Sequence, residues 1–194
     1  MKQLIALIIL LSASFFSNAY LINHVGTIDA KMYDNGKKQY FNADIFVYAG
    51  SNGQDSNIRL VFDMPKGMRS YDITFNGVNP SEVTEYQTLI RHLNKASDWA
   101  KIAQDNNANT IKDIGSWENY RSFTSCKISF ESSNGGRDIV TKIWIRNNFN
   151  LDEGTFRLTP KQVNQLLKWL DNASMIERLE ASAIENNQSD DLFN

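Results

Sequence analysis

The sequence predicts an α+β protein in which antiparallel sheets are each covered by one helix. Apolar and polar residues alternate over several short segments that end at Asn-Gly or Pro-Lys-Gly turns, a pattern typical of half-buried strands. Two longer segments instead carry apolar residues at helical spacing and begin with a capping residue followed by Pro. This order of strands and helix occurs twice, which favours two ββββα units derived from an internal duplication.

The first half is expected to contain four strands. Residues 27–33 alternate and end at Asp34-Asn35-Gly36, a strong hairpin sequence because Asn and Gly tolerate positive φ. The β-branched and aromatic run over 40–49 is the expected return strand. Alternation over 58–62 and 71–75 predicts the third and fourth strands.

A helix is expected to follow. Asn79 is a good N-cap, Pro80 suits the first helical position and Glu82 stands at N3. An apolar stripe then continues at helical spacing, and the helix is expected to end near Gln104.

The second half repeats this order. Strands are expected at 110–114, 121–132, 138–146 and 155–158, the first of them with a weak pattern. Thr159 is the expected cap of the second helix, with Pro160 at its first position and Gln162 at N3. The turns Ser51-Asn52-Gly53 and Ser133-Asn134-Gly135 also correspond.

One feature opposes the duplication. Aligning the two Ser-Asn-Gly turns places the apolar Ile45 and Val47 opposite the polar Lys127 and Ser129. A slip of one residue reverses the faces of a strand, and a β-bulge would be needed to repair it.

The N-terminus has the pattern of a cleavable signal peptide over residues 1–19. Lys2 precedes an apolar run over 4–11, and Ser17-Asn18-Ala19 places small residues before a cut at Tyr20. The alternatives are an uncleaved anchor and a buried N-terminal strand. The expected location of the protein is therefore periplasmic or secreted.

The remaining chain divides into two expected units and a tail. The first ββββα unit is expected over 20–106 and the second over 107–184. The acidic tail over 185–194 is expected to be disordered, with docking as a short linear motif as the alternative.

Composition limits the partners. The formal net charge is −2 at pH 7, which gives no general attraction for nucleic acid or anionic lipid. Cys126 is the only cysteine, so neither an intramolecular disulfide nor a multi-cysteine zinc site can form. No second apolar run has membrane length, so no integral membrane segment is expected after signal cleavage. No metal or other cofactor is expected.

Residues with catalytic potential show no catalytic motif. Cys126 shares the face of Ile128 and is expected to be a buried, inert thiol. His92 is expected on the surface of the first helix, and His24 in a mobile N-terminal segment. The aspartates of the first half are scattered over separate strands and turns: Asp29, Asp34, Asp44, Asp63 and Asp72. An enzyme is therefore not the favoured interpretation.

The candidate binding residues are Lys127, Lys142, Trp144 and Arg146. Alternation places Lys142, Trp144 and Arg146 on one side of their strand, with Lys127 beside them on the neighbouring strand. Aromatic side chains among cations suit contact with a protein, a glycan or an exposed base. The corresponding set in the first half is Phe46, Tyr48, Arg59 and Val61. Alternatively, the two halves pack these faces together or another segment covers them.

Three function classes follow. The favoured one is an exported soluble protein that binds a protein or glycan partner in the cell envelope or outside the cell. The second is a hydrolase that acts on envelope polymers through dispersed carboxylates. The third is a structural subunit of a surface assembly.

Overall fold

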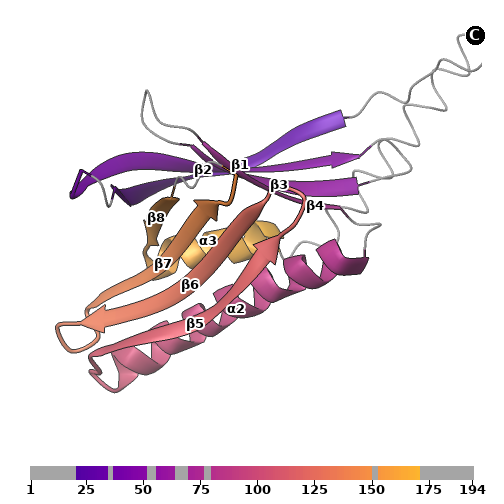
Figure 1. Cartoon of the computed structure of the whole chain (residues 1–194). Helices are drawn as coiled ribbons and strands as arrows, with labels where there is room; N and C mark the ends of the chain where they lie inside the picture. Colours follow the sequence, from indigo (N-terminus) through magenta and orange to yellow (C-terminus); the bar gives the residue numbers. More distant parts are fainter. Residues whose placement is uncertain are drawn as a thin grey trace, which may run out of the picture.

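The computed structural model describes residues 21–34, 37–51, 56–63, 70–76, 80–149 and 153–170. It confirms an antiparallel α+β protein, with eight strands in the order β4-β3-β2-β1-β8-β7-β6-β5 (Figure 1). The first four strands are β1 (Leu21–Asp34), β2 (Gln39–Ser51), β3 (Ser56–Asp63) and β4 (Tyr71–Asn76). The other four are β5 (Thr110–Asn119), β6 (Thr124–Ser133), β7 (Asp138–Asn147) and β8 (Glu153–Leu158).

The expectation of separate sheets is wrong, because β1 and β8 join the two sets of four strands into one sheet. Residues Lys31 to Tyr33 of β1 pair with Thr155 to Arg157 of β8 in antiparallel register. Unpaired strand edges expose backbone donors and acceptors, and pairing β1 with β8 removes one such edge from each set.

Two helices, α2 (Pro80–Asp105) and α3 (Pro160–Leu170), lie on the same face of this sheet (Figure 1). Helix α2 packs against β4, β5 and β6, whereas α3 packs against β1, β7 and β8. The prediction that each helix covers a sheet of its own is therefore wrong. The helices also contact each other, and Ser97 Oγ donates a hydrogen bond to Asn164 Oδ1 at 2.7 Å.

The start of α3 has the predicted capping arrangement. The Gln162 amide donates to Thr159 Oγ1 at 3.4 Å, while Gln162 Oε1 accepts from the Thr159 amide at 2.7 Å. This reciprocal pair satisfies backbone donors that the first helical turn leaves open. Helix α2 begins at Pro80 as predicted, but its expected cap, Asn79, lies outside the described residues.

The main hydrophobic core lies between the sheet and the helices. On β7, Ile139, Thr141, Ile143 and Ile145 are buried, and the intervening residues point away from the helices. The apolar stripe of α2 fills the opposite side of the core with Leu89, Leu93, Ala96, Ala100 and Ala103. The alternation in the sequence therefore assigned the faces of these elements correctly.

Cys126 is buried in this core, as expected, with 1% of its surface exposed. Burial raises the pKa of its thiol, and the nearby Glu85 carboxylate raises the pKa further. We expect a thiol reagent to label native Cys126 only as fast as the sheet opens, and Cys126→Ala to retain the fold. Rapid labelling in the absence of denaturant would contradict this placement.

The strands around the β5–β6 turn differ from expectation. Strand β5 extends to Asn119, and β6 begins only at Thr124. A turn separates them because Asn119 Oδ1 accepts from the Ser122 amide at 2.9 Å and Phe123 adopts a φ of 50°. Local side-chain bonds of this kind compete with strand pairing.

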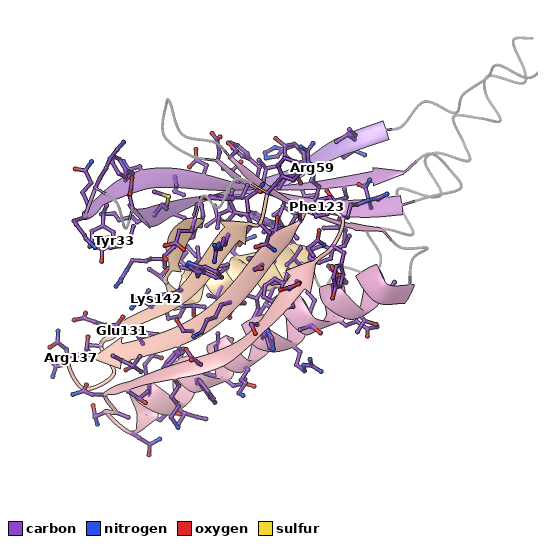
Figure 2. The ribbon with its side chains drawn as sticks, in the orientation of Figure 1. Tyr33, Arg59, Phe123, Glu131, Arg137 and Lys142 are labelled. Carbon is purple, nitrogen blue, oxygen red and sulfur yellow. The ribbon has the colours of Figure 1, made fainter. Side chains whose placement is uncertain are left out.

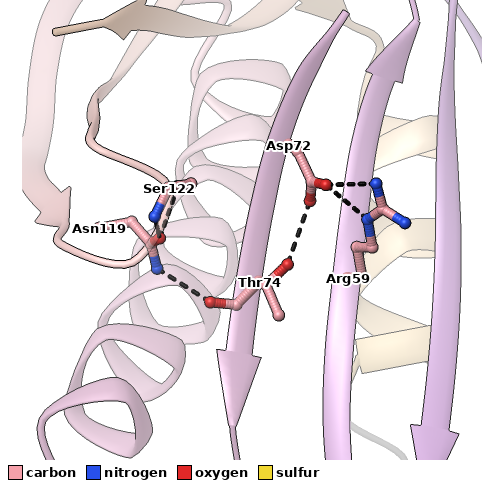
Figure 3. Close-up of polar contacts among 5 residues, drawn as sticks. All are labelled: Arg59, Asp72, Thr74, Asn119 and Ser122. Carbon is pink, nitrogen blue, oxygen red and sulfur yellow. Dashed lines mark hydrogen bonds and ion pairs between the residues drawn. The ribbon is translucent and has the colours of Figure 1, made fainter. Parts of the chain in front are cut away.

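Asn119 also connects the two edges of the sheet. Its Nδ2 donates to the carbonyl of Thr74 on β4 at 3.1 Å (Figure 3) and to Glu85 Oε2 on α2 at 2.7 Å. Asn119 is 1% exposed, so these bonds satisfy a buried amide. The edge strands β4 and β5 therefore come close together at this end, over the start of α2.

The β-bulges found among the described residues lie in the first strand of each half, β1 and β5. Val25 on β1 and Ile114 on β5 are each an extra residue in the pairing, and a glycine follows each of them. A Cβ on Gly26 would overlap the ring of Trp169 on α3, and a Cβ on Gly115 would overlap the ring of His92 on α2. Neither β2 nor β6 contains the bulge that would align the two Ser-Asn-Gly turns.

His92 is buried rather than on the surface, which corrects the sequence-based assignment. Its ring lies 6.0 Å from the ring of Trp117, and its Nδ1 has no hydrogen-bond partner within the described part of the chain. The ring occupies the space that Gly115 leaves open, a non-local contact that helical periodicity cannot reveal. Burial lowers the pKa of His92, and the charges of Arg91 and Lys95 lower it further.

This histidine predicts a pH-dependent stability. Because the folded state favours the neutral ring, the unfolded chain binds the proton more readily, with a pKa of about 6.5. The stabilisation that comes from burying neutral His92 should therefore be fully present above that pH. The free energy of unfolding should decline as the pH falls below it. Urea titrations between pH 8 and pH 5 should show a flatter profile for His92→Phe than for the wild type. Equal slopes would exclude His92 as the source.

Candidate functional site

The four predicted binding residues lie on the outward face of the sheet, defined here as the face that points away from α2 and α3. Lys127 on β6 is directly opposite Trp144 on β7, and Lys142 and Arg146 flank Trp144 along the strand. Lys127 is exposed, whereas the other three are half-buried. The corresponding residues of the first half lie on the same sheet, at a distance of several strands.

Two of these cations have acidic partners on the same face. Lys127 Nζ lies 2.9 Å from Asp113 Oδ2, and Lys142 forms an ion pair with Glu131 (Figure 2). The hydrogen bond from Lys142 holds the pKa of Glu131 below its usual range. Arg146 Nε is buried without a hydrogen-bond partner among the described residues.

Two further cations extend this surface and were not predicted from the sequence. Arg157 on β8 is paired directly with Lys142 on one side and with Lys31 of β1 on the other. These three residues form a cationic row across β7, β8 and β1. Within the described ranges, Lys31 and Arg157 form no ion pair. Like charges directly opposite each other destabilise a sheet. The Glu131 carboxylate, whose pKa is lowered by Lys142 and also by Arg157, offsets part of this repulsion at one end of the row but does not contact Lys31.

Three carboxylates form a second row beside the cations. Asp29 on β1 is opposite Asp44 on β2, and Asp44 is opposite Asp63 on β3. Lys31 and Asp29 are two residues apart on β1, so the cationic row and this aspartate row meet there. The aspartates that look scattered in the sequence are thus partly aligned in the fold.

A pocket of about 790 Å³ lies where the two rows meet. Its outward-facing lining consists of the polar and aromatic residues Asp29, Lys31, Tyr40, Asn42, Asp44 and Arg157, together with the apolar Val140. The pairing of β1 with β8 ends at Lys31 and Arg157, and the start of α3 occupies the gap beyond them. There Gln162 donates a hydrogen bond to the carbonyl of Asp29 and, with Thr159, completes the lining. We call this site the seam pocket.

Tyr40 is the aromatic residue of the seam pocket. It is 53% exposed, although its ring lies 4.9 Å from the ring of Tyr33 and 5.4 Å from the Arg157 guanidinium. These two contacts fix the ring while leaving much of it accessible. Tyr33 on β1, labelled in Figure 2, is the cross-strand partner of Tyr40 on β2.

The sequence did not reveal the seam pocket because its residues come from strands far apart in the chain. Alternation assigns Lys31 and Arg157 to the outward faces of their own strands, but only the β1–β8 register makes them neighbours. Their separation in the sequence carries no local pattern that predicts this pairing.

The outward residues of the first half form a separate cluster. Phe46, Tyr48, Arg59 and Val61 all point outward, as expected. His24 lies within β1 rather than in a mobile segment, and its ring is 5.4 Å from that of Tyr48. Arg59 Nε donates to Asp72 Oδ2 at 2.5 Å (Figure 3), so this cation is neutralised.

Neither a metal site nor a membrane-spanning helix occurs among the described residues. Among the described residues, no group of three His, Cys, Asp or Glu side chains is placed to hold a metal ion. No helix in the described ranges is long and apolar enough to cross a membrane. Comparison of the chain with protein-family models, curated proteins and solved structures finds no significant match.

Proposed function

We propose that the protein is an exported binding protein that recognises an envelope or extracellular partner with the outward face of β6, β7, β8 and β1. The helices pack on the opposite face, and within the described ranges the candidate residues of the outward face are exposed or half-buried. The observation that carries the proposal is the cationic row beside a pocket. Cations on directly paired positions repel each other in the free protein, whereas an acidic ligand bound in the pocket would be attracted to them.

Substitution of Trp144 tests whether the outward face binds a partner. Trp144 is the cross-strand partner of Lys127 on one side and of Thr155 on the other, and Trp is enriched among binding hot spots. We expect Trp144→Ala to leave the melting temperature nearly unchanged and to weaken retention of envelope proteins and polymers by the immobilised protein. Tyr120→Ala is the control, since this 73% exposed residue lies in the β5–β6 turn. A sharp fall in melting temperature would instead make Trp144 a structural residue.

Export rests on the signal-peptide pattern over 1–19, which lies outside the described residues. N-terminal sequencing of the exported protein should begin at Tyr20 or within a residue or two of it. Recovery of the protein in the cytoplasm with Met1 intact would exclude export. The predicted tail over 185–194 also lies outside the described residues.

Hydrolysis of an envelope polymer is the second candidate function. Asp29 and Asp44 line the same pocket and are cross-strand partners, so their Cα atoms are about 4.5–5.5 Å apart. Glycosidases use two carboxyl groups about 5–10 Å apart, a separation that two side chains on the same face of adjacent strands can adopt. Release of reducing ends by the wild type, lost in both Asp29→Asn and Asp44→Asn, would favour this function. Binding without release would favour the first.

We also propose that the two ββββα units, with a boundary near residues 106–107, arose by duplication. Val25-Gly26-Thr27-Ile28-Asp29 matches Ile114-Gly115-Ser116-Trp117-Glu118 in residue type, and both segments contain the bulge and its glycine. The rings that pack over these glycines are Trp169 and His92. They also correspond, because each is followed in its helix by a buried leucine, Leu170 and Leu93. The seam pocket would then lie where the last strand of one unit meets the first strand of the other.

A further inference from the structure

We propose that the seam pocket binds an acidic sugar, that is, a pyranose ring carrying a carboxylate within a polysaccharide. The inference rests on the proposed function, because it names the class of ligand that the same outward face recognises. Three features of the pocket support it: unpaired cations, carboxylates that accept hydrogen bonds, and an accessible aromatic ring.

The cations supply the site for the acidic group. In the described part of the chain, Lys31 and Arg157 are adjacent and have no ion-pair partner, whereas Lys142 is already paired with Glu131. A guanidinium binds a carboxylate through two parallel hydrogen bonds, and the lysine ammonium adds a second charge at close range. One carboxylate fits this arrangement better than a long polyanion, because Lys31 and Arg157 are the only two cations among the described residues that line the pocket.

The carboxylates argue for hydroxyl groups on the same ligand. Asp29 and Asp44 line the pocket beside the cations, and ionised carboxylates only accept hydrogen bonds. A purely anionic ligand would be repelled by them, whereas the hydroxyl groups of a sugar would donate to them. Asn42 adds an amide that can both donate and accept.

Tyr40 supplies an apolar surface for the ring of the sugar. A pyranose presents C–H groups on one face, and such groups pack against aromatic rings. Tyr40 is held by Tyr33 and Arg157 and remains 53% exposed. The pocket volume of about 790 Å³ lies within the range of small-ligand sites and leaves room for the neighbouring units of a chain.

Calorimetric titration with defined oligomers tests the ligand class. The probes are oligogalacturonate, hyaluronan fragments and alginate oligomers. Fully methyl-esterified oligogalacturonate serves as the uncharged match, and polyglutamate as an acidic polymer without sugar hydroxyls. We expect at least one acidic oligosaccharide to bind the mature protein, and to bind more weakly at high salt. Esterified oligogalacturonate should bind at least about tenfold more weakly than the acidic oligosaccharide that binds. Polyglutamate that binds as tightly as the sugars would overturn the proposal.

Variants separate sugar recognition from simple charge attraction. Arg157→Gln should weaken binding by about tenfold, whereas Arg59→Gln on β3 should not, because Arg59 lies outside the pocket and is paired with Asp72. Asp44→Asn removes a negative charge and so should strengthen the binding of a pure polyanion. It should weaken the binding of a sugar that donates to Asp44. Stronger binding by Asp44→Asn would therefore contradict the proposal.

Failure of this inference can be distinguished from failure of the proposed function. If none of the three acidic oligosaccharides binds while Trp144→Ala still reduces retention of envelope material, the acidic-sugar assignment is wrong and the outward face remains the binding surface. If both Trp144→Ala and Arg157→Gln leave that retention unchanged, the outward face is not the binding surface and both proposals fall.

Discussion

Gly136→Ala is expected to lower the free energy of unfolding by about 3 kcal/mol, the largest effect of any single substitution considered. Gly136 lies in the β6–β7 turn with a φ of 76°, which an L-residue with a side chain rarely adopts. A Cβ at this position would also overlap the carbonyl oxygen of Ala103 on α2. Backbone on both sides prevents a small local adjustment, so the turn and the helix would have to separate.

Gly135→Ala is the matched control for this experiment. Its φ of 63° imposes a similar left-handed penalty, but a Cβ there would lie 3.7 Å from the nearest atoms of Asn107, an ordinary contact. We expect a loss of about 1 kcal/mol by urea denaturation, so the two variants isolate the contact between the turn and α2. Equal losses would show that Gly136 does not touch the helix.

Gly115→Ala is expected to destabilise the protein by about 2 kcal/mol, because the added methyl group would overlap the His92 ring. His92 is 8% exposed and cannot swing into solvent without opening the contact between α2 and β5. Gly26→Ala on β1 should be destabilising for the same reason, through Trp169 of α3. Both effects would be measured by chemical denaturation at pH 8, where His92 is neutral.

A double-mutant cycle identifies the cause. If the overlap with His92 is responsible, Gly115→Ala should be much less damaging in the background of His92→Ala, where the ring is absent. Additive losses would mean that Gly115 is required for the bulge itself. Gly26 and Trp169 offer an independent cycle at the corresponding position of the first strand.

Local chemistry predicted most of the secondary structure. The Pro at the first position and the capping residues located the starts of both helices, and alternation located the buried faces of β2, β3, β4 and β7. The arrangement of these elements was harder to predict. That β1 pairs with β8, and that α2 packs on β5 and β6, depends on contacts between distant segments. No capping residue or alternation pattern encodes those contacts.

The candidate site was predictable only on the strands whose neighbours are consecutive in the chain. Lys127 and Trp144 could be placed side by side because β6 and β7 form a hairpin. Lys31 and Arg157 could not, since their strands lie at the two ends of the described chain. The matching segments around Gly26 and Gly115 are visible in the sequence. The rings that pack over these glycines are not, because the sequence does not indicate that a helix approaches each bulge, and so His92 was assigned to the surface.

Lysine footprinting in intact producing cells tests the binding face most directly, because it requires no knowledge of the ligand. A membrane-impermeant acylating reagent is applied to the cells and to the purified protein, and each lysine is quantified by mass spectrometry. Lys31 and Lys127 on the outward face should be protected in cells relative to the purified protein, while the exposed Lys101 of α2 and Lys161 of α3 react equally in both. Equal labelling of all four lysines, or protection confined to the helices, would contradict the proposed binding face.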